Sequence, residues 1–384
     1  MLEEVLEMSV TGIIFSNLHD NEISELTRVR TLASVPFGCR YRLIDFPLSN
    51  MVNSNISNIN VITQYNYHSL MDHIGTGKDW DLARRSGGIK ILPPYINSDV
   101  TMRTNLSNTR LEALKSVGYS IAQMTSDYVV MADCNVICNI DFNDVLNDHI
   151  ANGADVTIAV KRMNLDRAMA RANTLVFSSK EGRITDLLPN PTNFDGYADV
   201  SLNILVLNRK YLQDFVLDSI AHGYSSITRD VFLKSLYTRN FRVYRYDGYF
   251  ACISSFDDYY TCNMQLIKNK EIFDSFFGVE ERPIFTKVRN SAPTYYSENS
   301  KVENSLIADG CVIEGTVENS ILFRGVRVGK GAVVKNSILF QDTIISDASS
   351  VAYTVCDKNV VIRNNVNISG HTTLPLYIDR GKMV

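Results

Sequence analysis

A short repeat in the last part of the chain limits the possible folds more than any other feature. Between residues 301 and 368, apolar side chains recur every five or six residues, and glycine and asparagine fill many positions between them. A six-residue period is typical of a parallel β-helix, in which stacked coils bury one position per repeat. A β-sandwich, the alternative, would show strict alternation in strands about 8–12 residues apart. The recurring positions are Ile307, Val312, Val317, Leu322, Val328, Val334, Leu339, Ile345 and Val351.

Solenoids of this kind hold subunits together or carry an acyltransferase site. The second role usually needs a histidine as base, and this part of the chain has only His371, which lies beyond the last clear repeat. The repeat therefore favours a role in assembly.

The first part of the chain, up to about residue 275, alternates between two sequence patterns. Short apolar runs suit buried strands of a parallel sheet, and amphipathic runs between them suit helices. We therefore expect a doubly wound α/β domain over residues 1–275, a linker over 276–300 and the β-helix over 301–384. The expected strands are Val10–Phe15, Asn60–Tyr65, Tyr128–Asp133, Asp155–Val160 and Leu202–Leu207, and the expected helices are Arg110–Met124 and Phe142–Gly153.

Composition excludes several classes of partner. The net charge of −4 and the pI near 5.9 argue against nucleic acid or an anionic membrane held by bulk charge. No apolar run approaches the roughly 20 residues that span a bilayer, and the acidic N-terminus does not resemble a secretory signal. Seven scattered cysteines indicate reduced thiols in the cytoplasm, and neither they nor the six histidines have zinc-ligand spacing.

The turn after the first expected strand has an unusual charge. It lies in GIIFSNLHDNEISELT, Gly12–Thr27, at the edge of the sheet where a ligand cleft is expected. Nucleotide-binding turns are usually glycine-rich and basic, because backbone N–H groups and an arginine must approach phosphates. Between Phe15 and Thr27 there is no glycine, lysine or arginine, and Asp20, Glu22 and Glu25 stand there instead. This turn would repel phosphate.

A long central segment identifies a family. The stretch FGCRYRLIDFPLSNMVNSNISNINVITQYNYHSLMDHI, Phe37–Ile74, closely resembles the glucose-1-phosphate adenylyltransferases, and APTYY at Ala292–Tyr296 is also similar to them. The resemblance runs along nearly the whole chain. It implies a Rossmann-like nucleotidyltransferase domain followed by a C-terminal left-handed parallel β-helix of hexapeptide repeats. It also implies the reaction of ATP with glucose 1-phosphate to give ADP-glucose and pyrophosphate, assisted by Mg²⁺, in glycogen biosynthesis.

The residues that handle charge in the family are replaced here. Carried over position by position, the family's loop arginine corresponds to Glu22, and the lysine after that loop corresponds to Leu32. The two metal-binding aspartates correspond to Cys134 and Cys252, although a shifted loop would let Asp133 serve. The lysine that pairs with the sugar phosphate corresponds to Asn190. The resemblance therefore predicts no catalytic or metal-binding residues and points to the regulatory, GlgD-type subunits of the family.

Basic residues that follow the acidic turn are candidates for an effector site. In related enzymes this neighbourhood receives anionic sugar-phosphate or phosphate effectors, although solvated or acid-paired arginines are the alternative. Gln64 matches a family residue that couples effector binding to catalysis, or it satisfies buried backbone groups. The candidate residues are Arg28, Arg30, Arg40, Arg42 and Gln64.

The leading interpretation is a regulatory subunit that binds no cofactor for catalysis. It would form a mixed tetramer in the cytoplasm with a homologous catalytic subunit, which uses the Mg²⁺. Two alternatives remain open: a weakly active adenylyltransferase that uses Asp133, and a sugar nucleotidyltransferase or acyltransferase of other specificity. The missing basic loop counts against every phosphoryl-transfer alternative.

Overall fold

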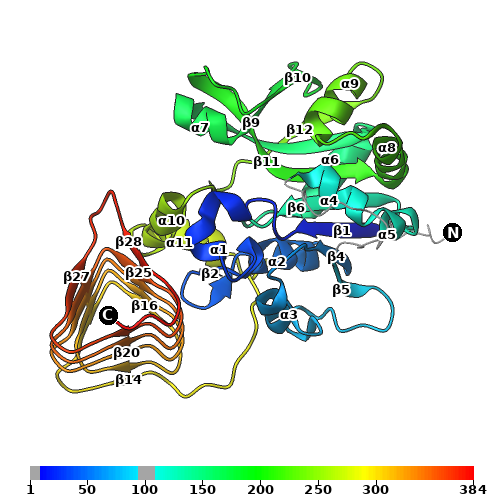
Figure 1. The fold of residues 1–384 in the computed structure, drawn as a ribbon. Helices are drawn as coiled ribbons and strands as arrows, with labels where there is room; N and C mark the ends of the chain where they lie inside the picture. Colours follow the sequence, from blue (N-terminus) through cyan, green and yellow to red (C-terminus); the bar gives the residue numbers. More distant parts are fainter. Residues whose placement is uncertain (1–8, 94–108) are drawn as a thin grey trace.

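The computed structural model describes residues 9–93 and 109–384 (Figure 1). The segment 1–8, which makes up most of the N-terminal stretch for which we expect no secretory signal, lies outside the described residues. Within the described parts of the chain, no helix has the length and apolarity needed to cross a membrane.

A mixed sheet forms the centre of the N-terminal domain, with strand order β10-β9-β11-β6-β1-β4-β5 and with β8 and β12 beside β11. Four of its strands run parallel, with β1 between β6 and β4 and with β5 at the edge. Their bounds are Val10–Phe15 for β1, Asn58–Ile62 for β4, Gly88–Leu92 for β5 and Tyr128–Asp133 for β6. The carboxyl ends of β1 and β6 therefore meet at one edge of the sheet, as expected.

The other half of the sheet is not parallel, which corrects the expectation for the last two strands. β11 pairs antiparallel with β6, β8 and β9, while β12 runs parallel to β8. A strand buried on both faces has the same continuous apolar pattern in either direction, so the pattern cannot reveal the direction. The bounds are Val156–Leu165 for β8, Thr174–Ser178 for β9, Ile184–Pro189 for β10, Gly196–Asn208 for β11 and Phe241–Arg245 for β12.

Helices cover both faces of this sheet and give two separate cores, one around α4, α5 and α8 and the other around α2, α3 and α6. The expected helix Phe142–Gly153 is confirmed as α6, after which Gly153 takes a left-handed φ of 55°. The expected single helix Arg110–Met124 is wrong, because the structure has two helices there, α4 and α5, with Val117 between them. The bounds are Asp45–Asn53 for α2, His68–Ile74 for α3, Arg110–Ser116 for α4, Gly118–Ala122 for α5, Phe142–Ala151 for α6 and Arg209–His222 for α8.

The C-terminal domain is a triangular left-handed β-helix with three parallel five-stranded sheets (Figure 1). The β14 face contains β14 (Tyr295–Tyr296), β17 (Val312–Ile313), β20 (Arg327–Val328), β23 (Ile344–Ile345) and β26 (Val361–Ile362). The β15 face contains β15 (Lys301–Glu303), β18 (Thr316–Glu318), β21 (Val333–Lys335), β24 (Ser350–Ala352) and β27 (Asn367–Ser369). The β16 face contains β16 (Leu306–Ile307), β19 (Ile321–Leu322), β22 (Ile338–Leu339), β25 (Thr354–Cys356) and β28 (Leu376–Ile378).

The repeat places most of the expected core positions inside the solenoid, and Val312 is the exception. Val312 aligns with Arg327 and Ile344 on the outer side of the β14 face, while Ile313 aligns with Val328 and is fully buried. Adjacent residues of a strand point to opposite faces, so an error of one residue exchanges inside for outside. The first coil also begins early, because β14 lies within the range expected for the linker.

The β16 face packs against the N-terminal domain (Figure 1). Ile321 and Ile338 join a core that contains Tyr259 of α10 (Phe256–Lys268) and Phe276 of α11 (Lys270–Phe277). The Tyr260 hydroxyl also donates to the Asn336 carbonyl at 2.6 Å. The two domains therefore share a continuous apolar interface.

Candidate functional site

The acidic turn after β1 closes on its own side chains. Asn17 Oδ1 accepts hydrogen bonds from Thr63 Oγ1 at 2.9 Å and from the Gln64 backbone N–H at 3.0 Å. Its Nδ2 donates to Asp20 Oδ2 at 2.6 Å, and Asp20 Oδ1 accepts from the Leu32 N–H at 2.8 Å. Burial raises the pKa of Asp20 to about 7, although these bonds oppose the rise. The Asp20 side chain therefore occupies the Leu32 N–H group from within the turn.

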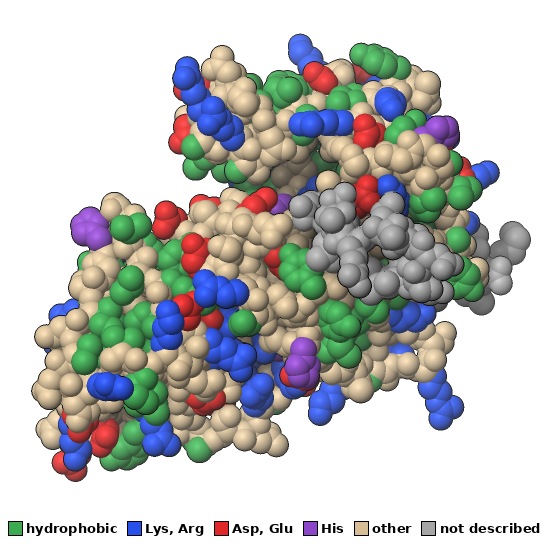
Figure 2. Space-filling view, in the orientation of Figure 1, with side chains coloured by type: hydrophobic (Ala, Val, Ile, Leu, Met, Phe, Trp, Pro, Cys, Tyr) green, Lys and Arg blue, Asp and Glu red, His purple; other side chains and the backbone are tan. Residues whose placement is uncertain are grey.

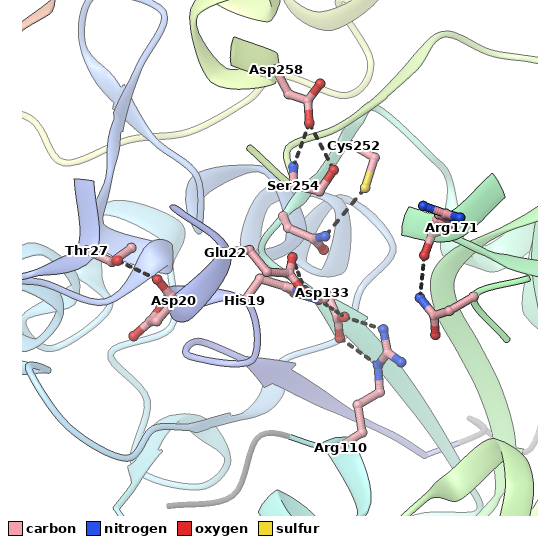
Figure 3. A network of polar contacts seen from close by, with 12 residues as sticks. His19, Asp20, Glu22, Thr27, Arg110, Asp133, Arg171, Cys252, Ser254 and Asp258 are labelled. Carbon is pink, nitrogen blue, oxygen red and sulfur yellow. Dashed lines mark hydrogen bonds and ion pairs between the residues drawn. The ribbon is translucent and has the colours of Figure 1, made fainter. Parts of the chain in front are cut away.

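Asp133 lies at the carboxyl end of β6, where two cations hold it (Figure 3). Arg110, the first residue of α4, donates from Nε to Asp133 Oδ1 at 3.0 Å and from Nη2 to Oδ2. His19 Nε2 lies 3.2 Å from the same Oδ2, and His19 Nδ1 lies 3.0 Å from Glu22 Oε2. The Asp133 side chain is only 1% exposed, so both of its oxygens are occupied by the protein.

The charges of this cluster shift each other's protonation. Burial alone would raise the pKa of Asp133, but the Arg110 charge and the bond from His19 lower it overall. Burial alone would lower the pKa of His19, but Asp133 and Glu22 outweigh it and raise the pKa to about 9. At neutral pH the cluster therefore holds two cations and two carboxylates and has no excess charge to offer a ligand.

A cleft of about 570 Å³ opens beside this cluster. On one side lie α7 (Arg167–Ala172) and β11, and on the other lie β13 (Phe250–Cys252) and α10. The space-filling view shows a hollow between the upper lobe and the body of the molecule (Figure 2). Glu22, Asn190 and Cys252 all line the cleft, so the structure brings together three of the positions that the resemblance predicts to be replaced. Asn190 donates to the Arg171 carbonyl, in α7 (Arg167–Ala172), at 2.9 Å, so its amide binds the protein's own backbone.

The residues of the cleft do not fit Mg²⁺, the metal that the family resemblance implies. Magnesium prefers oxygen ligands, and both oxygens of Asp133 are taken. Burial raises the pKa of Cys252, in β13 (Phe250–Cys252), to about 12, and the thiol accepts from Asn135 Nδ2 at 3.4 Å. Cys134 is also buried, and burial raises its pKa well above the ordinary value. Residues 9–93 and 109–384 contain no group of three His, Cys, Asp or Glu that could hold a metal ion.

The nearby carboxylate of Asp258 is part of a helix start. Its Oδ2 accepts from Ser254 N at 3.1 Å and from Ser254 Oγ at 2.9 Å (Figure 3). Its backbone N–H donates to the Ser255 side chain. This is how α10 is capped. The Oδ2 atom of Asp258 is therefore engaged at the start of α10.

The five candidate effector residues occupy different environments. Arg28 is exposed and pairs with Asp379 at 3.1 Å. Arg30 is buried and donates from Nη2 to both oxygens of Asp357 in the β-helix, at 2.7 and 2.8 Å. Gln64 lies at the acidic turn through its bond to Asn17. The structure brings only Arg40 and Arg42 of these five to one pocket.

Comparison with known proteins identifies the family. Residues 21–268 match the nucleotidyl transferase family, and residues 291–373 match the GlmU-like, C-terminal hexapeptide family. The chain is 34% identical to glycogen biosynthesis protein GlgD of Bacillus subtilis (strain 168), over 96% of this chain and 95% of that protein. It is 32% identical to glucose-1-phosphate adenylyltransferase of Thermosipho africanus (strain TCF52B), over 85% of this chain and 78% of that protein. The chain belongs to the glucose-1-phosphate adenylyltransferase family. A second GlgD, from Geobacillus stearothermophilus, is 35% identical over 84% of this chain and 82% of that protein.

The pocket that contains Arg40 and Arg42 lies at the junction of the two domains of this chain. The turn of β2 (Pro36–Phe37) and β3 (Tyr41–Arg42) supplies one wall, and the linker and the β-helix supply the others. The basic residues that line it are Arg40, Arg42, Arg289, Arg324 and Lys358.

Nearby carboxylates balance this basic pocket only in part, and Asp357 accepts from the Lys358 backbone N–H at 2.6 Å. Arg324 pairs with Asp309 at 3.0 Å, and Asp45 accepts from the Arg42 backbone N–H and lies 2.6 Å from His73 Nε2. Burial, together with the charges of Arg42 and Arg30, lowers the pKa of Lys358 to about 7. The Lys358 ammonium is therefore only partly protonated at neutral pH.

Sequence reasoning missed the residues that decide the charge of both sites. Arg110 and His19 neutralise Asp133, and Arg289, Arg324 and Lys358 complete the junction pocket. His19 gave a weak signal, because it lies in the acidic turn. The other four gave none, because their residue types alone do not show which residues they meet in the fold.

Proposed function

We propose that this chain is a non-catalytic regulatory subunit of glucose-1-phosphate adenylyltransferase in glycogen biosynthesis. It would act in the cytoplasm in a mixed oligomer with a homologous catalytic subunit, which holds the Mg²⁺. The observation that carries the proposal is Asp133, whose oxygens are taken by Arg110 and His19. The GlgD relatives support the choice of pathway.

The physical argument concerns charge. Transfer of an adenylyl group requires positive groups that stabilise the developing charge on the phosphates. In this cleft the cations near the turn are already paired with Asp133 and with Glu22, and Glu22 itself lines the cleft. Removing one such stabilising donor typically costs about 10²–10³-fold in rate, and here several are replaced.

The test is pyrophosphate release from ATP and glucose 1-phosphate with Mg²⁺, first with this protein alone. We expect a rate equal to the blank without enzyme. Adding the chain to a catalytic adenylyltransferase subunit should then change the rate or the effector response of that subunit. Robust turnover by this chain alone would instead support the alternative, a weakly active enzyme that rebuilds its site around Asp133.

We further propose that the junction pocket binds a phosphate or sugar-phosphate effector. The support is its excess of cations and the lowered pKa of Lys358, which an incoming anion would raise again. Binding of inorganic phosphate at pH 8 should therefore take up protons, which calorimetry in buffers of different ionisation enthalpy measures. Replacing the exposed Arg40 and Arg289 by glutamine should weaken binding, whereas the matched change of the exposed Lys210 and Lys330 should not. Equal affinities in the two double variants would contradict this site.

A further inference from the structure

A buried ion pair joins the two domains beside the junction pocket. Arg30 precedes β2, and Asp357 directly follows β25 of the β-helix. Arg30 Nη2 donates to both carboxylate oxygens of Asp357, at 2.7 and 2.8 Å, and both side chains are only 2% exposed. Asp357 also accepts from the Tyr377 hydroxyl and from the Lys358 backbone N–H, both at 2.6 Å. Each oxygen of this carboxylate therefore has two donors.

The surroundings of this ion pair do not require a charge. Ile321, Ile338 and Phe340 belong to the apolar core through which the two domains pack. A buried ion pair adds little net stability to such a contact, because both charges lose their hydration. A guanidinium, a hydroxyl and a backbone N–H are, however, donors that bind phosphate oxygens. Asp357 therefore occupies a set of donors that also suits an anion from outside the chain.

Arg30 has the capacity for a further acceptor. Its Nη1 atom is buried and has no hydrogen-bond partner in residues 9–93 or 109–384. Burial and the charges of Arg42 and Arg30 lower the pKa of Lys358, and burial and the Arg30 charge lower the pKa of Arg42. Both Arg42 and Lys358 line the junction pocket. Arg30, Arg42 and Lys358 therefore form one group of cations at the wall of this pocket, and Asp357 pairs with its buried member.

We propose that Asp357 competes with the effector anion for Arg30, so that a phosphate entering the junction pocket displaces this carboxylate from the guanidinium. The inference rests on the proposed effector site and names how that site is regulated. Only the bonds from Arg30 to Asp357 break in this exchange, because the Tyr377 hydroxyl and the Lys358 N–H stay with the carboxylate. The affinity of the pocket for phosphate is therefore set by the difference between two anions at one arginine.

Displacement of Arg30 would reach the acidic turn beside the cleft. Arg30 donates its backbone N–H to the Thr27 carbonyl at 3.2 Å. Leu32, two residues later, donates its own N–H to Asp20 Oδ1 at 2.8 Å. The segment that carries Arg30 is thus bonded to the turn on both sides of this residue. Phosphate binding at the junction and the position of the turn are therefore coupled through this segment.

The experiment is a calorimetric titration of the full chain with inorganic phosphate at constant ionic strength. Asp357→Asn should tighten phosphate binding about tenfold or more, because a neutral amide competes less for Arg30. Asp379→Asn is the matched control. Asp379 pairs the β-helix with Arg28 at 3.1 Å, two residues before Arg30, but it does not line the pocket. That variant should bind phosphate like the wild type.

A second variant separates exchange from a simple change of charge. Removal of any negative charge near the pocket would tighten phosphate binding to some extent. If Asp357 acts by competing for Arg30, Asp357→Asn should no longer tighten binding once Arg30→Gln is present. A charge effect at a distance would persist in that double variant.

A stability readout covers a variant that is weakly folded. Asp357→Asn leaves Arg30 buried without a charge partner, so its melting temperature should fall. Saturating phosphate should raise the melting temperature of this variant by more than it raises that of the wild type. A purely structural role would lower the melting temperature equally with and without phosphate, which would contradict the exchange.

The outcomes distinguish the exchange from the effector site. Equal phosphate affinities of the wild type and Asp357→Asn would overturn the exchange and leave the junction pocket in place. Tightening that persists in the Arg30→Gln background would do the same. Absence of phosphate binding in the wild type and in all variants would instead overturn the proposed effector site, and the exchange with it.

Discussion

The cleft beside Asp133 and the basic pocket at the domain junction handle charge in opposite ways. In the cleft, Arg110 and His19 are paired with Asp133 and Glu22, so the charges balance within the protein. In the junction pocket five basic residues meet few carboxylates, and burial suppresses the charge of Lys358. The difference supports the proposal that an anion binds at the junction pocket and not in the cleft beside Asp133.

The largest expected effect concerns the balanced cluster. Asp133→Asn keeps the shape of the side chain but leaves Arg110 without its charge partner, so we expect the free energy of unfolding to fall by about 3–5 kcal/mol. Chemical denaturation measures it, with the exposed Asp257→Asn as control. A loss below about 1 kcal/mol would show that the cluster is not a structural unit.

The next effect is a pH dependence from His19. Its folded pKa of about 9 lies above the ordinary 6.5, so its contribution to stability is complete below pH 6.5 and disappears as the pH rises through 9. We expect the wild type to lose about 2 kcal/mol relative to His19→Gln between pH 6 and pH 9.5, allowing for screening of its partly exposed ring. Parallel stability curves for the two proteins would contradict the pairing with Asp133.

A smaller effect tests the unbalanced pocket. Inorganic phosphate at ten times its dissociation constant should stabilise the wild type by about 1.4 kcal/mol. Arg40→Gln combined with Arg289→Gln should remove most of that gain, because both guanidinium groups line the pocket. Thermal unfolding at constant ionic strength, with chloride as the reference anion, measures it. Undiminished stabilisation in the double variant would place the anion elsewhere.

The smallest effect should be none at all. Glu22→Arg restores a cation at the turn, yet Asp133 remains held by Arg110 and His19. We therefore expect pyrophosphate release by this variant to stay at the blank. Measurable turnover would mean that the charge of the turn, and not the pairing of Asp133, is what distinguishes the cleft from the junction pocket.

Much of the architecture could be predicted from local pattern. The six-residue repeat predicted the β-helix. The expected strands Val10–Phe15 and Tyr128–Asp133 match β1 and β6, so the edge of the sheet beside the cleft was also predicted. The direction of β11 could not be predicted, since a strand that is buried on both faces has the same apolar pattern in either direction. The register prediction was wrong at Val312, because its neighbour Ile313 is the residue that points into the core.

The candidate site divides in the same way. The sequence by itself determined that the turn is acidic, because residue identity is a local property. That Cys252 and Asn190 stand where the family has charged residues stays a prediction from the resemblance. Only the tertiary structure decided what those charges do: it set Arg110 against Asp133 and Arg30 against Asp357, which lies 327 positions along the chain. Electrostatic energy depends on distance and burial, and both arise when the chain packs.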